Sequence, residues 1–568
     1  MGPSGTESRL LSPVRRVEKV VGPPKGRVVA LVFEDGPTAA PPRPEPREPR
    51  WRGNRGTAKP GTGGGGGITD FILDVLGVYS AKATFAIIGS TAANYPDVQG
   101  PVGSPQWNGV AYDHFPEFGR DALAGAVANP DLVRRILSEG HELANHSWRH
   151  IVFGPEAGTY GPPRKKGHHA GFAAALGDFR ELHDHIRENF GYEMRLGRPP
   201  HYVDAIRPTP AGGPGERDAY DVLAELNYNY LGRGIDGGGW GTSSGSYDAD
   251  VDKMVLGLQR MLEKDGRALC GAVVSQKDGY DFAGRSPVVA ALPREMQLFR
   301  NYGYRVVTVS ALLEMSPFAD IGPGHPVFEA ARKLAREGWW VAFRDNTVRP
   351  EAPVTRGELA VWAAGAAVGA GAGATGTGAA AAGAAGPPGD AVGGLAPRTV
   401  YVDVPAGHPY RWAVETAARR GLWRGLKTTS GRPNDPEARG NRVFGLWDPV
   451  SPAEFAEVMG RTGIAVDFSL ASESGPPASA VGSAAVPRSR RPDEPVLTHG
   501  QALVMLAAAL GGSLAAGESA ASAASESSAA GRESAAGRDS AAGRERPGSR
   551  AGGEGKKSAK KGKKSQGS

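Results

Sequence analysis

Cysteine is almost absent from this sequence, since Cys270 is the single thiol among 568 residues. One cysteine excludes an internal disulfide and any metal site built from several thiolates. The composition therefore fits either a reducing compartment or a surface protein that needs no cross-links.

Long apolar runs are also missing. The first 26 residues carry charges and lack the apolar segment of a secretory signal. One long uncharged stretch, residues 359–389, is almost wholly alanine and glycine, whose transfer into lipid is only weakly favourable. We therefore expect no transmembrane segment, and no signal peptide is visible.

Excess positive charge is absent from the body of the chain. The net charge is +6, but residues 546–568 alone contribute +7, which leaves the remaining residues near −1. A neutral body with a basic end argues against a protein dedicated to specific nucleic-acid binding. We expect that end to be a solvated, disordered tail.

Two short polar motifs follow apolar runs. Glu34 and Asp35 precede Gly36-Pro37, and His146 and His150 stand four residues apart. Alone, such an acidic pair is commonly a solvated turn, and such histidines are commonly surface residues. Together, one carboxylate and two imidazoles offer three ligands for a divalent metal, with positions left for water, and the second carboxylate is a ready general base. The combination favours hydrolysis by a metal-bound water.

Residues 27–315 alternate β-rich runs with amphipathic segments, which predicts parallel strands connected by helices. The fold class we expect is α/β, a distorted (β/α) barrel of about seven parallel strands. The expected strands are 28–33, 83–88, 141–145, 194–198, 227–231, 272–276 and 305–310. Polar residues directly follow these strands, namely Asp35, His146, Arg198, Asp236 and Lys277. Because the carboxyl ends of barrel strands form one rim, we expect these side chains to meet there.

The character of the sequence changes after residue 316. Ser or Thr precedes Glu or Gln by three residues at positions 355, 451 and 498, which is the pattern of a capping box that opens a helix. Asp-Ile or Asp-Val and a helical pattern precede the first two copies. We expect a small all-α region of three helical-hairpin repeats, the third truncated.

The expected domains are a disordered N-terminus (1–26), the barrel (27–315), repeat one (316–364), an Ala/Gly linker (365–397), repeat two (398–465), partial repeat three (466–511) and a low-complexity basic tail (512–568).

Residues 27–315 resemble the polysaccharide deacetylase family, the NodB homology fold. The segment 32–37 resembles the family's first motif, T-F-D-D-G-P, and 139–150 resembles its metal-binding segment. Arg198-Pro199-Pro200 resembles the third motif, 236–240 resembles D-x-x-D-W, and 273–279 stands where the family has L-L-H-D-G.

The resemblance implies roles for these residues. Asp35, His146 and His150 would bind a divalent metal, typically zinc. Glu34 would be the general base, and Arg198 would orient it. Lys277 would take the place of the general acid, and a backbone N–H near His201 would help to hold the oxyanion. The groove for the sugar would be lined by Trp240 and Asp236.

The sequence departs from the family at several of these positions. Glu34 stands where the family has Asp, and its added methylene shifts the carboxylate. Lys277 replaces the family's His, and His201 replaces an aromatic residue, which makes His201 a second candidate for the acid. Gly239 replaces the second acidic residue of the fourth motif.

The C-terminal repeats resemble S-layer homology modules. Thr355-Arg356-Gly357-Glu358 is close to the T-R-A-E signature of that family, and Asp403-Val404-Pro405 is close to its D-V-P opening. The resemblance implies that Arg356 and Glu358 bind a cell-wall polymer. A purely structural role of the repeats is the alternative, since Pro452 and His499 replace the arginine in the other two. It also implies a location on the cell envelope or outside the cell.

Three functions are compatible with these patterns. The leading one is a hydrolase that removes N-acetyl or O-acetyl groups from a cell-wall or chitin-like polysaccharide. The alternative is a catalytically impaired carbohydrate-binding protein that keeps the fold, which the changes at Glu34 and Lys277 favour. A structural S-layer component is the third.

Overall fold

The computed structural model describes residues 10–42, 66–90, 124–153, 171–206, 217–240, 246–369, 401–424, 443–467 and 495–510, except 24, 152, 205, 282–284, 402 and 405–407 within these ranges. The predicted basic tail, 512–568, lies outside the described residues, as does most of the Ala/Gly linker.

One curled sheet of parallel strands forms the first part of the chain. Its nine described strands are β1 (Arg16–Val17), β2 (Arg27–Gly36), β3 (Thr84–Ile87), β4 (Glu142–Asn145), β5 (Leu196–Gly197), β6 (Asn229–Leu231), β7 (Ile235–Gly238), β8 (Val273–Lys277) and β9 (Tyr304–Val307). The order is β1-β6-β5-β4-β3-β2-β8-β7, and β9 also pairs with β2. The fold is therefore the distorted (β/α) barrel that the sequence predicts.

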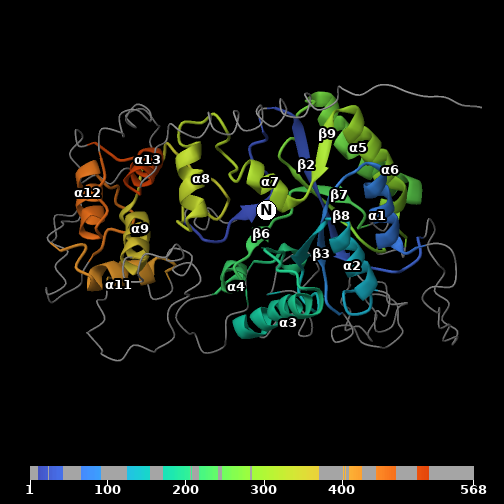
Figure 1. Cartoon of the computed structure of the whole chain (residues 1–568), viewed down its shortest axis with the longest axis horizontal. Helices are drawn as coiled ribbons and strands as arrows, with labels where there is room; N and C mark the ends of the chain where they lie inside the picture. The colour runs from blue at the N-terminus through green and yellow to red at the C-terminus, as the bar shows by residue number, and fades with distance from the viewer. Residues whose placement is uncertain are drawn as a thin grey trace, which may run out of the picture. The chain divides into compact units, whose positions relative to one another are not determined.

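Helices cover the outer side of this sheet. They are α1 (Ile68–Val78), α2 (Pro130–Ser138), α3 (Phe172–Phe190), α4 (Ala219–Glu225), α5 (Tyr247–Lys264) and α6 (Pro287–Asn301). Helix α7 (Val309–Met315) instead packs against β2 from the opposite face, where Val309 and Leu312 are buried. Helix α6 packs between α1 and α5, beside β9 (Figure 1).

The two faces of the strands belong to two different cores. On β2, Val29, Leu31 and Phe33 pack under the helices, whereas Val28, Ala30 and Val32 join a second cluster on the opposite face. Successive side chains of a strand point to opposite faces. The residue that continues the second series is a polar one, Glu34, and it lies at the carboxyl end of the strand.

Two sequence expectations for the barrel are corrected. Within the expected disordered segment 1–26, the described residues are part of the fold, because β1 pairs with β6 and apolar side chains such as Val14, Val17 and Val20 are buried. The strand β7 was not expected, since its sequence, Ile-Asp-Gly-Gly, is short and rich in glycine.

The C-terminal part is all-α, as the sequence predicts. Its described helices are α8 (Phe328–Arg336), α9 (Arg356–Gly369), α11 (Arg411–Arg419), α12 (Pro452–Arg461) and α13 (His499–Ala509). Helix α9 extends five residues into the predicted linker, because the alanines of 363–367 continue the helix readily. No helix in the described residues is long and apolar enough to cross a membrane.

Backbone hydrogen bonds connect the residues that lie before three of these helices. Val354, Val450 and Leu497 each precede a helix-capping residue. Val354 N donates to Leu497 O (2.9 Å), Leu497 N donates to Val450 O (3.0 Å), and Val450 N donates to Val354 O (2.8 Å). This closed triangle relates the starts of α9, α12 and α13 by a pseudo-threefold arrangement.

The aspartates of the first two repeats have equivalent structural roles. The carboxylate of Asp320 accepts hydrogen bonds from Val348 N and Arg349 N, and that of Asp403 accepts them from Phe444 N and Gly445 N. Each aspartate thereby fixes the turn that leads into the following capping segment. The sequence repeat is thus also a repeat of hydrogen bonds.

Candidate metal centre and catalytic site

The strands direct polar side chains toward the inner face of the barrel at their carboxyl ends. Glu34 continues the inward-facing series of β2, and Lys277 continues Val273 and Ser275 on β8. His146 follows Ala144 of β4 by two residues, and Ala144 belongs to the inner cluster. These ends form one rim, as expected for a parallel barrel.

A β-bulge lets two neighbouring carboxylates share this site. The pairing of β2 with β3 shifts register between Glu34 and Gly36, so that Asp35 is the extra residue. Asp35 has a φ of +72°, in the left-handed region that non-glycine residues seldom adopt. A regular strand would direct Glu34 and Asp35 to opposite faces, and the bulge changes the direction of Asp35.

Asp35, His146 and His150 meet at one point. Asp35 Oδ1 lies 3.0 Å from His146 Nε2 and 3.1 Å from His150 Nε2. The two Nε2 atoms are 3.2 Å apart, and all three side chains are buried. One donor atom from each residue lies within 4.8 Å of the others, an arrangement that a metal ion could occupy.

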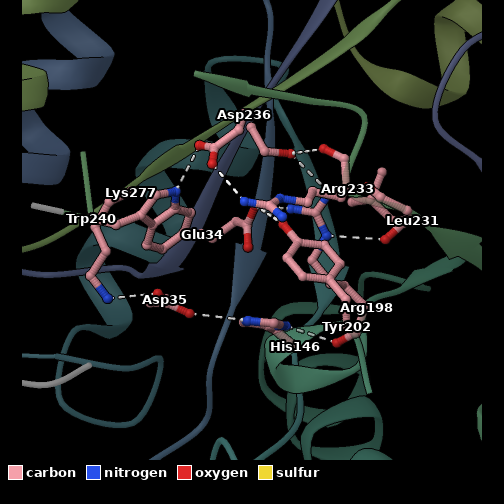
Figure 2. Close-up of polar contacts among 12 residues, drawn as sticks. Glu34, Asp35, His146, Arg198, Tyr202, Leu231, Arg233, Asp236, Trp240 and Lys277 are labelled. Carbon is pink, nitrogen blue, oxygen red and sulfur yellow. Dashed lines mark hydrogen bonds and ion pairs between the residues drawn. The ribbon is translucent and has the colours of Figure 1, made fainter. Parts of the chain in front are cut away.

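The chain around His146 fixes the direction of its ring. His146 Nδ1 is hydrogen-bonded to the carbonyl oxygen of Arg198 (2.7 Å), which leaves Nε2 directed toward Asp35 (Figure 2). Metal-binding histidines typically use their other ring nitrogen in this way. Ser147 Oγ accepts a hydrogen bond from His150 N (2.9 Å), which turns the second histidine back toward the first. The donor set fits a divalent metal such as zinc.

Backbone conformations of low probability cluster around this site. Besides Asp35, positive φ angles occur at Ser147 (73°), His150 (56°), His201 (56°) and Tyr202 (58°). Such conformations cost roughly 1–3 kcal/mol each and persist where the surrounding structure imposes them, often at functional sites.

The Glu34 carboxylate is held by two residues. Oε1 is ion-paired with Arg198 Nη1 and accepts a hydrogen bond from the Tyr202 hydroxyl (2.7 Å; Figure 2). Arg198 is fixed in turn by hydrogen bonds to Leu231 O (3.0 Å) and Ser275 Oγ (3.0 Å). Burial and the neighbouring Glu34 carboxylate raise the pKa of Tyr202 well above its usual range, although Arg198 opposes this, so the phenol remains a donor.

Tyr202 was not among the residues predicted from the sequence. The comparison with the third motif indicates His201, because the family has an aromatic residue at that position. The hydroxyl that contacts Glu34 belongs instead to the next residue, Tyr202. The short 3₁₀ turn η5 (Pro200–Tyr202) places both at the site, with the His201 ring centroid 5.1 Å from that of His150. The signal in the sequence that could have identified Tyr202 is its aromatic side chain close to this motif.

The Asp35 carboxylate is also bound to Lys277. Lys277 Nζ lies 2.6 Å from Asp35 Oδ2. Burial raises the pKa of Asp35, but Lys277 and the two histidines outweigh it, and the net result is a pKa well below the usual range. Asp35 is therefore a carboxylate in this structure.

Trp240 and Asp236 lie together on the rim. Trp240 Nε1 donates to Asp236 Oδ1 (3.0 Å), and the other Asp236 oxygen is ion-paired with Arg233 (2.6 Å). The Trp240 ring centroid lies 5.5 Å from Lys277 Nζ, the atom that contacts Asp35. Trp240 and Asp236, the two predicted substrate-binding residues, therefore lie near the three predicted metal ligands.

Asp278, by contrast, has a structural role next to Glu34. It is buried, its carboxylate oxygens accept from Thr69 Oγ1 at 2.8 Å, and its N–H donates to Glu34 O (2.7 Å). Burial raises its pKa to about 7. A Cβ on Gly36 would lie 2.0 Å from Asp278 Oδ2, so this position requires glycine.

The second predicted site is buried, which corrects the expectation of direct polymer contact. Arg356 is 1% exposed and Glu358 is 3% exposed. Arg356 Nε is ion-paired with Glu454 of the second repeat (2.9 Å), and Glu358 Oε2 is paired with His499 Nε2 of the third (3.0 Å). The starts of α9, α12 and α13 face one another in the pseudo-threefold arrangement. The side chains of Arg356 and Glu358 therefore connect one repeat to the others.

Two protein-family models match parts of the chain. Residues 21–203 match the family model for polysaccharide deacetylase, and residues 317–360 match the one for the S-layer homology domain.

Solved structures similar to this chain have low sequence identity. Peptidoglycan deacetylase PdaC from Bacillus subtilis is 19% identical, with 55% of this chain and 96% of that chain covered and a TM-score of 0.30. A family 4 acetyl xylan esterase from Clostridium thermocellum, in complex with a cobalt ion, is 16% identical, with 51% and 91% covered and a TM-score of 0.28. A CE4 family pseudoenzyme from Bacillus anthracis is 15% identical, with 53% and 70% covered and a TM-score of 0.29.

Proposed function

Because the chain carries a polysaccharide deacetylase domain and an S-layer homology domain, we propose that it is a metal-dependent hydrolase that removes acetyl groups from a cell-wall or chitin-like polysaccharide at the cell surface. The observation that carries this proposal is the convergence of Asp35, His146 and His150 beside the Glu34 carboxylate, which Arg198 and Tyr202 hold.

Asp35, His146 and His150 would hold the metal, with zinc as the expected ion. When bound, a divalent cation polarises an acetyl carbonyl and makes a coordinated water a better nucleophile at neutral pH. The three protein ligands are one carboxylate and two imidazoles, a set that catalytic zinc sites use while leaving a position open.

Glu34 would act as the general base. Arg198 and Tyr202 both contact its Oε1, which fixes the carboxylate in one orientation. Two groups on the rim, the imidazole of His201 and the ammonium of Lys277, are candidates to deliver the proton to the leaving group. Trp240 would bind a sugar ring on its exposed face, beside Asp236.

An assay of acetate release tests the proposal. The full chain, supplied with zinc, would be incubated with chito-oligosaccharides, peptidoglycan and acetylated xylan, and a chelator-treated sample would serve as the control. The proposal expects acetate from at least one N- or O-acetylated substrate, with loss of activity after chelation and recovery on zinc addition. Absence of acetate from all of them, with zinc bound, would contradict it.

A catalytically impaired carbohydrate-binding protein is the second candidate. The ion pair of Lys277 with Asp35 favours it, since an ammonium on a metal ligand opposes a second cation there. This candidate predicts glycan binding by the barrel, measured by titration calorimetry with the same oligosaccharides, without acetate release.

The repeats would attach the protein to a polymer of the cell wall. Since Arg356 and Glu358 are buried between repeats, their contribution would be to keep the three repeats assembled. Sedimentation of the chain with purified cell walls measures this attachment.

A further inference from the structure

Lys277 occupies an unusual position next to the metal-ligand triad. It ends β8, whose register with β2 places Lys277 opposite Glu34. Its side chain is 3% exposed, and its Nζ lies 2.6 Å from Asp35 Oδ2. The ammonium is thus ion-paired with a predicted metal ligand.

The two oxygens of Asp35 face different partners. Oδ1 faces His146 at 3.0 Å and His150 at 3.1 Å. Figure 2 shows His146 and Lys277 on either side of this carboxylate, with Oδ2 facing Lys277. One oxygen of the carboxylate therefore faces the expected metal position, and the other is paired with the ammonium of Lys277. On its other side, the ammonium lies 5.5 Å from the Trp240 ring, so the side chain is confined within the site.

We propose that Lys277 is a positioning residue that acts as a built-in counter-ion of Asp35 and thereby weakens the affinity of the triad for a divalent metal. The inference rests on the proposed function in that the triad must be a metal site. It assigns Lys277 a role that requires no proton transfer, and it predicts that the metal is held loosely and exchanges with its surroundings.

Two physical effects act in the same direction. First, the metal-free site is already neutralised, because the buried Asp35 carboxylate has the Lys277 ammonium as its partner. A buried charge without a partner is costly, so removing the ammonium would make the metal the main partner of Asp35. Second, the ammonium and a bound divalent cation repel each other across one carboxylate, and burial reduces the screening of this repulsion.

Zinc affinity of charge variants tests the inference. Metal-free full chain would be titrated with zinc by calorimetry at one fixed pH for the wild type, Lys277→Met, Lys277→Gln and Lys277→Arg. We expect the two neutral variants to bind zinc about 10–100-fold more tightly, the range by which partners of metal ligands change affinity. Lys277→Arg keeps the charge and should stay within about threefold of the wild type.

A matched control and a second readout separate charge from general damage. Lys82→Met removes another partly buried ammonium, one that donates to Glu139 O, and should leave zinc affinity unchanged. Thermal unfolding with and without zinc gives the second readout, and the gain in melting temperature on zinc addition should be larger for Lys277→Met than for the wild type. Absorption of the cobalt-loaded chains would report whether the ligand set is retained.

The outcomes decide the inference independently of catalysis. The inference would be overturned if both neutral variants were folded and bound zinc no more tightly than the wild type. It would also be overturned if Lys277→Arg gained as much zinc affinity as the neutral variants. If the neutral variants do not fold without metal but refold on zinc addition, the counter-ion role is supported. Tighter zinc binding without acetate release from any chain would support the inference and count against the proposed hydrolase.

Discussion

The Tyr202 hydroxyl and the Glu34 carboxylate are joined by a hydrogen bond of 2.7 Å, to the same oxygen that Arg198 contacts. Tyr202 reaches this position through two successive residues with positive φ, 56° at His201 and 58° at Tyr202. The strained turn thus places a phenol where it can fix the orientation of the proposed general base.

Replacement of Glu34 by glutamine should abolish most of the activity. A positioned general base contributes roughly 10²–10⁴-fold to rate, so Glu34→Gln should lower kcat by about that factor while zinc binding persists. Steady-state acetate release measures the loss. Glu314→Gln, at an exposed position on α7, should have full activity. Unchanged kcat in Glu34→Gln would show that another group is the base.

Removal of the Tyr202 hydroxyl should have a smaller effect. Tyr202→Phe leaves the Arg198 contact in place and removes one hydrogen bond to a charged group, which typically contributes about 1.5–3 kcal/mol. We expect kcat/KM to fall roughly tenfold or more, with the loss mainly in kcat. Tyr192→Phe, whose hydroxyl accepts a bond from Leu143 N on the other side of the barrel wall, is the control. A loss confined to KM would argue that Tyr202 binds substrate instead.

The stability of the barrel should depend on pH through Glu295. This fully buried residue of α6 accepts a hydrogen bond of 2.5 Å from Gln276, and burial raises its pKa from 4.5 to about 7. The folded state therefore keeps the proton to higher pH than the unfolded state. Its contribution to stability is complete below a pH of about 4.5 and is lost as the pH rises through about 7.

Glu295→Gln should remove that dependence. Relative to the wild type, its free energy of unfolding should rise by up to roughly 3 kcal/mol between pH 4.5 and pH 8. Denaturant unfolding at several pH values, followed by a signal from the barrel, gives the comparison. If the free energies of unfolding of Glu295→Gln and the wild type differed by the same amount at every pH, the assignment would be contradicted. The control, Glu314→Gln, should show no pH-dependent difference from the wild type.

The ion pair between Arg356 and Glu454 should stabilise the repeats. Arg356→Met leaves the Glu454 carboxylate without this partner in a mostly buried position, and breaking such a pair typically costs about 3–5 kcal/mol. The double variant Arg356→Met/Glu454→Met should recover much of the loss. Unfolding followed by fluorescence of the buried Trp362 and Trp423 measures both.

An exposed arginine provides the control for that experiment. Arg419→Met on α11 removes an exposed guanidinium and should change stability by less than about 0.5 kcal/mol. If folded Arg356→Met lost attachment to cell walls without any loss of stability, direct contact of Arg356 with the polymer would be restored as the explanation.

The barrel and the convergence of Asp35, His146 and His150 could be predicted because their signals are local. The alternation of apolar residues in β2 indicates both the strand and the inward direction of Glu34, and the position of His146 after β4 places it on the same rim. The strand β7 was missed because Gly237 and Gly238 carry no apolar pattern.

The remaining errors concern contacts between distant segments. Nothing local indicates that Lys277 Nζ contacts Asp35, 242 residues earlier, or that Arg356 pairs with Glu454 of another repeat. A capping-box pattern shows that a helix begins at Arg356, but exposure of that residue depends on how three such helix starts pack together.

The zinc content of the full chain after equilibrium dialysis against zinc tests the central claim most directly, with His146→Ala and His150→Ala measured beside the wild type. We predict about one zinc ion per wild-type chain and a loss of most of it in each variant, with Glu34→Gln unchanged. Equal zinc content in the wild type and both histidine variants would contradict the claim that Asp35, His146 and His150 form the metal centre.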